Sequence, residues 1–446
     1  MHTEAGRRWL VALVLAAGIL VRVAALPFPG TGDVRIWKVW TYNAATIGVS
    51  RMYGVGGTFE TPSPYRLLRF GALEAIADYP PLSLYELGIA GSAYQRAAGG
   101  SFPDTTALTI SIKAVPVVFD AALCALLFVS LRRVAGDVSA WWAVVAYWLN
   151  PAAIINASFG GYLDALFVLP AVGSLIAATA GWPALAGGLI AASVLTKPQG
   201  IFVVPAVAIA VWRAGAPSGR RSRLIAAAAG AALVSAIVMA PFVAAGSWWN
   251  MVHGVGSQAN EIYLSMEGYN FWWMAGHFLW VAYGWQRGLD AWAVFVGPVT
   301  RIPFVRAAAH GLPFLRVAGM MLALAGIGWG VWIGRRAREL SLVAAVGAFS
   351  VHAYAVLGSQ VHENHLFAAM PMLVIAAAAR RRFVPVLAGV STFLALSMLF
   401  YIFGDEEGRW VLSRSFTLLD TTLLLAVLNC TLLAWHGAVL RAETRP

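Results

Sequence analysis

Long apolar segments separated by short polar ones occupy most of the sequence. A helix crosses the hydrocarbon core of a bilayer with about 20 predominantly apolar residues, and only helices or closed barrels satisfy their backbone hydrogen bonds there. The pattern predicts an all-α, polytopic integral membrane protein with about 11 to 14 transmembrane helices. The candidate spans are 9–26, 108–131, 138–156, 159–180, 183–197, 200–213, 224–246, 314–334, 341–357, 366–379, 384–403 and 415–437.

The composition excludes the main alternatives. Hydrophobic residues make up 60% of the 446 residues and charged residues only 11%, whereas an ordinary soluble domain carries about 25% charged residues. The mean hydropathy is +0.73. A soluble protein of this length could not cover its surface with so few charges, and a disordered chain or a small disulfide-rich scaffold is also excluded.

The net charge of +11 does not indicate a nucleic-acid partner. All but three of the 31 basic residues are arginines, and most lie in short clusters between apolar segments, where membrane proteins keep their cytoplasmic anchors. The clusters are Arg7-Arg8, Arg132-Arg133, Arg213 with Arg220-Arg221-Arg223, Arg335-Arg336-Arg338, Arg380-Arg381-Arg382, and Arg441 with Arg445. With all of them inside, the spans alternate and both termini are cytoplasmic.

This topology predicts a large first extracytoplasmic loop over 27–107. Further outer segments are 156–164, 197–200, 247–313, 358–366 and 404–414. Two fairly apolar stretches, 80–98 and 268–308, fall on this side, and each is re-entrant, interfacial or a pair of short crossings. Nearly every unusual polar residue of the chain also lies on this side.

The first polar motif heads a helix in the large loop. Ile36, Trp37 and Trp40 follow Asp33 at helical spacing, which predicts an amphipathic helix at the membrane surface with its tryptophans at headgroup level. Asp33 is either the N-cap of this helix or a carboxylate held at the interface as a general base.

Three more motifs lie in outer segments. Asp78-Tyr79 precedes two prolines that start a helix, so Asp78 is either a helix cap or part of a site. Asp164 lies at a membrane boundary, where acids are costly and are usually paired or functional. Lys197, followed by Gln199, is a cation on the outer side, against the usual charge asymmetry.

A histidine motif, His362-Glu363-Asn364-His365, follows a later span. It differs from the zinc-protease pattern because its histidines are three residues apart rather than four. The motif suits contacts with a phosphate or a sugar hydroxyl, a pair that stabilises its loop, or, less favoured, a divalent metal.

Basic residues also collect on the outer side, after Asn270 and Trp272. They are Arg301, Arg306, His310 and Arg316, and Lys113 lies near the outer start of its span. Each alone is explained as a snorkelling anchor, but the set favours an anion site, since guanidinium groups bind phosphate bidentately.

Taken in order, these motifs resemble GT-C membrane glycosyltransferases, in particular the ER glucosyltransferases that extend the lipid-linked oligosaccharide and their prokaryotic relatives. The resemblance covers about residues 20 to 375. It rests on Gly32-Asp33, Asp78-Tyr79-Pro80-Pro81-Leu82, Lys113 with Asp120, Tyr162-x-Asp164, Lys197-x-Gln199, Tyr269-Asn270-x-Trp272 and Val361-His362-Glu363. The chain is shorter than typical ER members, and its arginine and alanine content favours a prokaryotic cell membrane.

The resemblance implies an inverting hexosyltransferase with a polyprenyl-phosphate sugar donor and a glycan, glycolipid or protein acceptor on the extracytoplasmic face. Asp33 is then the general base. Donor phosphate or sugar is bound by Lys113, Lys197, Gln199, Arg301, Arg306, His362 and Glu363. Substrates are positioned by Asp78, Tyr79, Asp164, Asn270, Trp272 and His365. No cofactor is expected.

The predicted organisation is a catalytic module over 1–246 and a C-terminal module over 247–446 that completes the donor and acceptor site. Two other functions stay open. A transporter or flippase of lipid-linked glycans is disfavoured because transporters usually place polar residues at the midplane within repeated halves. A non-catalytic subunit that keeps the fold is the third possibility.

Overall fold

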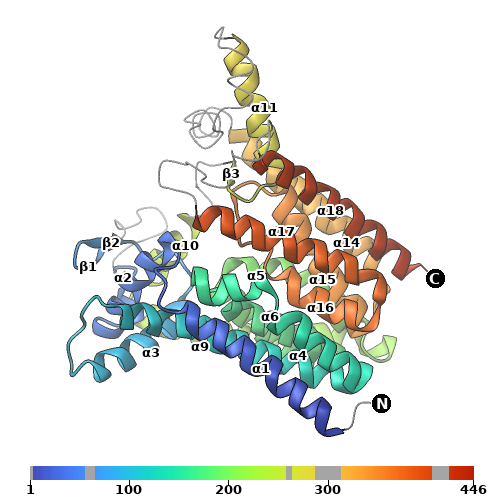
Figure 1. The fold of residues 1–446 in the computed structure, drawn as a ribbon, viewed down its shortest axis with the longest axis horizontal. Coiled ribbons are helices and arrows are strands. Elements are labelled where there is room, and N and C mark those ends of the chain that lie inside the picture. The colour runs from blue at the N-terminus through green and yellow to red at the C-terminus, as the bar shows by residue number, and fades with distance from the viewer. Residues whose placement is uncertain (1–3, 56–65, 258–263, 287–312, 404–420, 446) are drawn as a thin grey trace. The chain divides into compact units, whose positions relative to one another are not determined.

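The computed structural model describes residues 4–55, 66–257, 264–286, 313–403 and 421–445 (Figure 1). Within these residues, six helices are long and apolar enough to cross a membrane, by length and composition: Thr106–Trp148, Pro217–Ala244, Phe314–Gly334, Leu340–Leu357, Arg381–Ile402 and Thr422–Thr444. Shorter apolar helices are Val11–Ala25, Asp164–Thr179, Pro183–Thr196, Pro198–Arg213 and Ala369–Ala379. The predicted class, an all-α polytopic integral membrane protein, is confirmed.

The chain divides into two compact units. The first comprises Met1–Asn260 and Arg338–Leu340, and the second comprises Glu261–Ala337 and Ser341–Pro446. Helices of the first unit are α1 (Glu4–Ala25), α2 (Gly32–Thr46), α3 (Pro81–Ala97), α4 (Thr106–Trp148), α5 (Pro151–Ile154), α6 (Asp164–Thr179), α7 (Pro183–Thr196), α8 (Val204–Arg213), α9 (Arg220–Ala244) and α10 (Trp248–Ser257). Its short elements are η1 (Val49–Arg51), η2 (Ile155–Gly160), η3 (Pro198–Val203), η4 (Pro217–Gly219) and the antiparallel pair β1 (Leu68–Phe70) and β2 (Leu73–Ala75).

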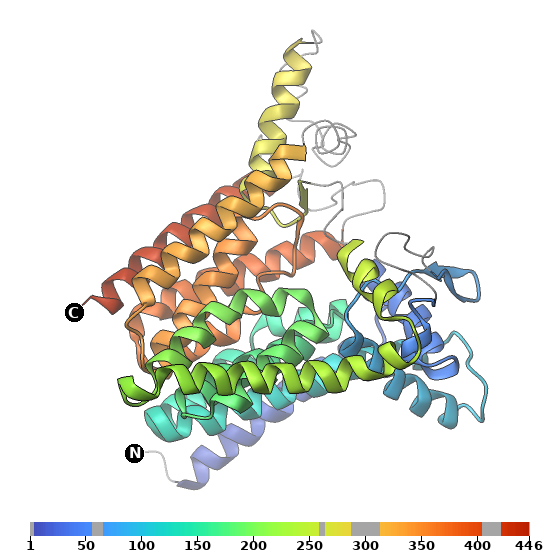
Figure 2. The same cartoon turned by 180° about the vertical axis from the view of Figure 1, so that it is seen from behind.

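Apolar helices form the body of this unit. Helix α7 packs against α6 and α9, and α4 packs against α6. Helix α9 lies on the face of the unit seen in Figure 2, and large apolar side chains along it, among them Ile225, Leu233 and Ile237, are exposed. An exposed apolar face on a helix of this length is the surface that a membrane protein presents to lipid.

Two predicted spans, 108–131 and 138–156, begin within the single helix α4. The helix turns sharply at Gly136, where φ is 82° and ψ is 171°. Only glycine adopts this backbone conformation without steric cost. The turn comes directly after Arg132 and Arg133, where the sequence predicts the chain to leave the membrane on the cytoplasmic side.

Helices α2 and α3 lie in the predicted outer loop, and α2 packs on α3 and on the β1–β2 hairpin. The predicted amphipathic helix is thus present, but its predicted orientation is wrong for the tryptophans. Trp37 and Trp40 are 2% and 1% exposed, so their rings pack inside the protein instead of facing lipid headgroups. Burial removes more apolar area from water than contact with an interface, which favours this packing. Of the three aromatic and aliphatic residues, only Ile36 is exposed.

The stretch 80–98, left open by the sequence, is helix α3, which packs on α2, α4 and α7. Its first residues are prolines at the positions where the first helical turn tolerates them. Of the stretch 268–308, the structure describes helix α11 (Phe271–Gln286), and residues 287–308 lie outside the described part of the chain.

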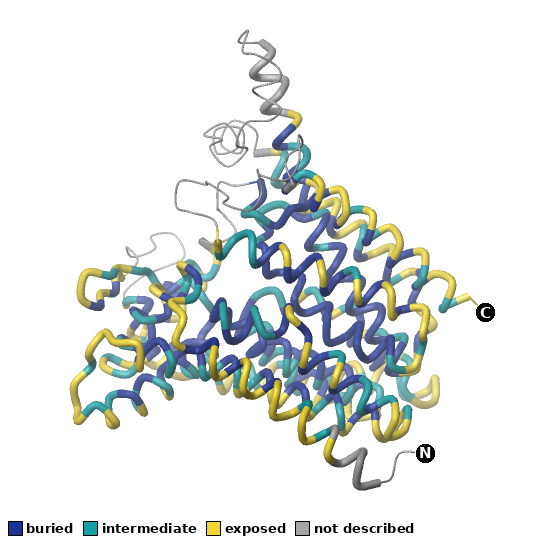
Figure 3. The backbone as a smooth tube through the Cα atoms, in the orientation of Figure 1, coloured by how far each residue is buried: buried dark blue, intermediate teal, exposed yellow. Residues whose placement is uncertain are grey.

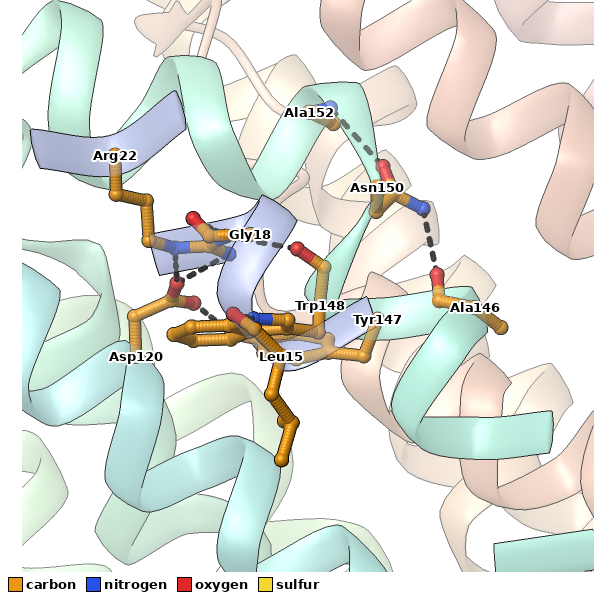
Figure 4. Close-up of polar contacts among 9 residues, drawn as sticks. All are labelled: Leu15, Gly18, Arg22, Asp120, Ala146, Tyr147, Trp148, Asn150 and Ala152. Carbon is orange, nitrogen blue, oxygen red and sulfur yellow. Dashed lines mark hydrogen bonds and ion pairs between the residues drawn. The ribbon is translucent and has the colours of Figure 1, made fainter. Parts of the chain in front are cut away.

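A buried ion pair joins α1 to both arms of α4 (Figure 4). Arg22 Nη2 lies 2.6 Å from Asp120 Oδ2, and Tyr147 Oη donates to Asp120 Oδ1 over 2.5 Å. The guanidinium also donates to the Trp148 carbonyl over 2.7 Å and lies 3.7 Å from the centre of the Trp148 ring. Because both oxygens of the Asp120 carboxylate have a partner, burial of the ion pair away from water is tolerated.

In the second unit the helices are α11, α14 (Pro313–Gly334), α15 (Leu340–Leu357), α16 (Ala369–Ala379), α17 (Val384–Ile402) and α18 (Thr421–Thr444). The short elements are β3 (Ser265–Met266), β4 (Val361–His362), which pairs with β3 in parallel, and η7 (Arg381–Phe383). Helix α18 packs against α11, α14 and α17. Helices α15 and α16 are almost entirely buried (Figure 3).

Candidate functional site

Asp33 lies in the first turn of α2 and is half-buried. The N-cap of the helix is Thr31, so the interpretation of Asp33 as the N-cap is wrong. Two hydrogen bonds fix this end of α2 to the turn before α6. The Thr31 amide donates to the Gly160 carbonyl over 3.0 Å, and Trp37 Nε1 donates to the Gly161 carbonyl over 3.1 Å.

The segment before that turn is a π-helix, η2, which ends at Gly160 and has Gly161, with φ 76°, as its C-cap. A Cβ atom at Gly161 would lie 2.9 Å from Val34 Cγ2 and 3.0 Å from Lys113 Cγ. Glycine is therefore required both for the left-handed backbone and for the close approach. The wider helix leaves the Asn156 carbonyl to accept the Tyr162 amide over 3.0 Å. Single π-turns within α-helical segments are rare and occur often at functional sites.

Three side chains from separate segments meet beside this turn. Lys197 Nζ lies 2.5 Å from Asp164 Oδ1, and Asn156 Nδ2 donates to Asp164 Oδ2 over 2.8 Å. Asp164 is 1% exposed and Lys197 is 3% exposed. Both carboxylate oxygens of Asp164 thus have a partner, which is what burial of an ion pair requires.

Tyr79 closes another side of the same cluster. Its ring centre lies 5.7 Å from Lys197 Nζ and packs at 5.2 Å from the ring of Trp37 and 5.1 Å from that of Trp40. The Tyr53 hydroxyl donates to the Tyr79 carbonyl over 2.5 Å. The two rigid prolines that follow start α3 and fix where the segment ends.

The cluster determines the charge of its members. Burial raises the pKa of Asp33 from 3.8 to about 6, while the positive charge of Lys197 lowers it and the negative charge of Asp164 raises it. Burial would lower the pKa of Lys197, but Asp164, Tyr79 and Asp33 outweigh it and raise that pKa. Burial raises the pKa of Tyr79, so its phenol is neutral. Near neutral pH the group therefore holds a carboxylate that can still take a proton.

The other candidates of the first unit lie differently. Lys113 Nζ donates to the carbonyls of Ala25 and Phe28, each over 3.0 Å, and so joins the end of α1 to α4. Gln199 lies in η3, two residues after Lys197, and is half-buried. Asp78 is half-buried beside Tyr79. The structure thus brings Asp33, Tyr79, Asp164 and Lys197 together, and gives Lys113 contacts of a structural kind.

In the second unit, Asn270 and Trp272 hold the loop that follows α15. Asn270 Nδ2 donates to the carbonyls of Ala355 and Gly358 over 3.2 and 3.0 Å, and Asn270 Oδ1 accepts from the Trp272 amide over 3.1 Å. Trp272 Nε1 donates to the Leu357 carbonyl over 2.7 Å. The Asn270 motif is therefore tied to the end of α15 and to Gly358, shortly before the histidine motif begins.

The histidine motif lies on this same loop. His362 is in β4, because Val361 and His362 pair with Ser265 and Met266. His365 Nδ1 shares a hydrogen bond of 3.0 Å with the Tyr354 hydroxyl and accepts from the His362 amide over 3.3 Å. In the part of the chain that the structure describes, no group of three or more His, Cys, Asp or Glu side chains is arranged to hold a metal ion.

Backbone strain collects around this loop. Glu267, Tyr269 and Gln360 have φ values of 59°, 38° and 61°, a region that side chains other than glycine rarely adopt. Glu267 also pairs with His362 across an isolated bridge, and burial raises its pKa to about 7. Strained residues of this kind cluster at binding and active sites.

Three of the basic candidates, Arg301, Arg306 and His310, lie outside the described residues. Two buried residues with a polar role are not among the predicted candidates: Asn156, which holds Asp164, and Arg22, which pairs with Asp120. A signal for Arg22 was present, since an arginine inside an otherwise apolar segment usually has a buried partner. For Asn156 no comparable signal exists.

No family model and no curated protein matches the sequence. Among solved structures, the chain is similar to ArnT from Cupriavidus metallidurans in the apo state, with 14% identity over 99% of this chain and 78% of that one, and a TM-score of 0.50. The same protein bound to undecaprenyl phosphate has 15% identity over 98% of this chain and 77% of that one, with a TM-score of 0.46. The oligosaccharyltransferase AglB from Archaeoglobus fulgidus, in complex with an inhibitory peptide and a dolichol-phosphate, has 14% identity over 98% of this chain and 56% of that one, with a TM-score of 0.44.

ArnT is a membrane glycosyltransferase of the GT-C superfamily. Its likeness extends over nearly the full length of the present chain, at 14% identity. The chain therefore has the GT-C fold that its motifs indicated.

Proposed function

We propose that the protein is an inverting glycosyltransferase that moves a sugar, a hexose, from a polyprenyl-phosphate donor to a hydroxyl group of a lipid-linked glycan, glycolipid or protein. The reaction takes place on the extracytoplasmic face of the membrane, with both termini in the cytoplasm. The GT-C fold and the order of the sequence motifs support this class of reaction.

The observation that carries the proposal is the setting of Asp33. Asp33 is half-buried in the first turn of α2, the charges of Lys197 and Asp164 both act on it, and burial raises its pKa to about 6. A general base works best when its pKa lies near the operating pH, because it is then ionised and still has a useful affinity for a proton. An acid on the surface, with its usual pKa near 4, is a weaker base.

The reaction follows from this chemistry. Asp33 takes the proton of the acceptor hydroxyl as the oxygen attacks the anomeric carbon. The bond between that carbon and the phosphate oxygen breaks on the opposite side, and the polyprenyl phosphate leaves with the electron pair. The anomeric centre is inverted. Since phosphate is a stable anion, the leaving group needs positive charge nearby rather than a separate acid.

For the other residues we propose the following roles. Asp78, Tyr79 and Asp164 position the substrates in the first unit. The roles that the sequence assigns in the second unit, donor binding by His362 and Glu363 and positioning by Asn270, Trp272 and His365, stay part of the proposal. So do those of Gln199, Arg301 and Arg306. Lys113 is the weakest member, because both its described hydrogen bonds go to backbone carbonyls.

The test is a donor-consumption assay. Purified protein in detergent is given polyprenyl-phosphate glucose or mannose and a panel of acceptors, and we expect donor to be consumed. Asp33→Asn should lose at least ~10²-fold in rate, the scale of a positioned base. Asp104→Asn is the matched control, because Asp104 is an exposed acid whose only described ion pair is with Lys38, and it should keep the wild-type rate.

Two results would change the proposal. Turnover at the wild-type rate in Asp33→Asn would remove Asp33 from the mechanism. Movement of a lipid-linked glycan across proteoliposome membranes, without consumption of any donor, would favour the flippase instead.

A further inference from the structure

We propose that Lys197 is a positioning residue that keeps the Asp33 carboxylate ionised next to a second carboxylate, that of Asp164. The inference rests on the proposed function, because it explains how the proposed base stays available. It differs from the role in donor binding that the sequence motif assigned to Lys197.

The first step of the argument is how firmly Lys197 is held. Its ammonium contacts Asp164 Oδ1 at 2.5 Å, and Asn156 holds the other oxygen of that carboxylate at 2.8 Å. The rings of Tyr79 and Phe167 lie 5.7 and 5.9 Å from Nζ. A buried lysine with a charged partner and aromatic rings around it has few other rotamers open to it.

The second step is that the start of α2, which carries Asp33, is fixed beside the same group. Thr31 and Trp37, two residues before and four residues after Asp33, are both bonded to the Gly160–Gly161 turn. That turn lies three to four residues before Asp164 in the chain. The start of α2 is thus fixed to the segment that carries the second carboxylate, and the charges of Asp164 and Lys197 both act on Asp33.

The third step concerns the balance of charge. Asp33 and Asp164 are two acids, and among the described groups the charge of Lys197 acts most strongly on Asp33. Tyr79, which also faces them, is neutral, and Arg35 on the same helix as Asp33 is exposed. Two carboxylates that share a site without a cation do not both ionise, because one keeps its proton. Asp33, which lacks the direct ion pair, is the acid that would take it.

The ion pair with Asp164 leaves Lys197 little net positive charge with which to bind a phosphate. The positive charge of Lys197 is balanced at 2.5 Å by Asp164, so a donor phosphate would meet a nearly neutral pair. Lys197 therefore acts on the reaction through Asp33. Its position also explains why a lysine occurs on the outer side of the membrane, where the usual asymmetry of charges disfavours it.

The experiment titrates the Asp33 carboxyl group directly. Full-length protein in proteoliposomes is followed by infrared difference spectroscopy across pH, and the spectrum of Asp33→Asn is subtracted to isolate the band of Asp33. Lys197→Met should raise the pKa of Asp33 by about 1 unit or more, the usual scale for a lost counter-charge. Asp164→Asn should lower it, since the repulsion is gone and Lys197 is released. The double variant should return toward the wild-type value.

The matched control is Lys38→Met. Lys38 is a cation on the same helix as Asp33, but it pairs with the exposed Asp104 at 2.7 Å, so the titration of Asp33 should not move. If Lys197 had only a structural role, Lys197→Met and Asp164→Asn would both lower the stability of the protein, but they would not shift the pKa of Asp33 in opposite directions. If Lys197→Met does not fold, Asp164→Asn and Lys197→Arg carry the test, and the latter should keep the wild-type titration.

The proposal is overturned if Lys197→Met titrates like the wild type, or if Asp164→Asn shifts in the same direction as Lys197→Met. No substrate enters this measurement. Opposite shifts in a protein that consumes no donor would therefore support the charge relationship and overturn the proposed reaction, so the two failures are distinguishable.

Discussion

Gly187 of α7 lies so close to Ala227 of α9 that a Cβ atom at position 187 would overlap the Ala227 backbone. The relationship is reciprocal, because a Cβ atom at Gly230 of α9 would overlap the backbone of Ala184 in α7. Small residues at matching positions let two helix backbones approach, which is the main source of packing between helices in a membrane.

Gly187→Leu should therefore separate α7 from α9. We expect a loss of about 1 to 3 kcal/mol or more, because the added atoms meet backbone that cannot move aside. The measurement is the apparent melting temperature in detergent together with the fraction of monodisperse protein. Gly328→Leu in α14 is the control, since nothing lies within 4 Å of a Cβ atom there. Equal melting temperatures for the two variants would contradict the close packing.

The buried ion pair between Arg22 and Asp120 gives a second prediction. Arg22→Met leaves the Asp120 carboxylate buried without its cation, and breaking such a pair costs about 3 to 5 kcal/mol. The exposed pair of Arg132 and Asp137, with N–O distance 2.8 Å, is the control of the same chemistry. Arg132→Met should cost about 1 kcal/mol or less. Thermal unfolding of both variants in one detergent tests the difference, which fails if the two lose equal stability.

Two buried asparagines allow a paired test. Asn43 donates to the carbonyls of Val39 and Arg69 over 2.8 and 3.1 Å. Asn250 is 2% exposed, and neither polar atom of its side chain has a partner in the described part of the chain. Asn43→Leu should lose about 1 to 3 kcal/mol, because an acceptor is left unsatisfied. Asn250→Leu should be neutral or stabilising, because a buried polar group without partners is replaced by an apolar one of similar size. Destabilisation by Asn250→Leu equal to that of Asn43→Leu would show that Asn250 has polar contacts.

The helices could be predicted from the sequence because their cause is local. Apolar segments of spanning length predict the positions of α9, α14, α15 and α17 closely, whereas α18 (Thr421–Thr444) ends seven residues beyond its predicted span of 415–437. The direction of Trp37 and Trp40 could not be predicted, because the same helical spacing suits a lipid surface and a protein core. What decides is Tyr79, which is distant in sequence and packs on both rings.

The candidate site was predictable as a set of residues but not as an arrangement. Asp33, Asp164 and Lys197 stand out because charged residues are rare in this chain and these lie on its predicted outer side. Their meeting depends on the π-helix at Ile155–Gly160, whose register is set by the Asn156–Tyr162 hydrogen bond and by the tie to Thr31. The spacing of the histidine motif was compared with that of a metal-binding helix. The motif begins instead in a strand, which forms by pairing with Ser265 and Met266, a segment far away in the sequence.

Removal of metal ions tests the charge-based mechanism. In the proposed reaction the polyprenyl phosphate leaves as a stable anion, so we expect donor consumption to continue in the presence of EDTA. The control is re-addition of Mg²⁺ or Mn²⁺, which should not raise the rate. Strict dependence on a divalent ion would contradict this mechanism and would assign His362 and His365 as ligands, whose rings lie 4.9 Å apart.

The proposed role of Asp33 as the base predicts a pH dependence, because burial raises the pKa of Asp33 to about 6. A base acts when ionised, so kcat/KM should rise about tenfold per pH unit below pH 6 and level off above it. Stability has the opposite sign. A carboxyl group whose pKa is higher in the folded protein than its ordinary value of 3.8 binds its proton more tightly when folded, so it loses stabilising effect as pH rises from about 4 to 6.

Asp33→Asn removes this penalty along with the base. The variant should therefore melt at a higher temperature than the wild type at pH 7, by roughly 1 to 4 °C, and the difference should vanish toward pH 4. The measurement is thermal unfolding of both proteins across this range, with Asp104→Asn as an exposed acid that should follow the wild type. A constant difference at every pH would mean that Asp33 titrates normally, and the case for its role as a tuned base would be lost.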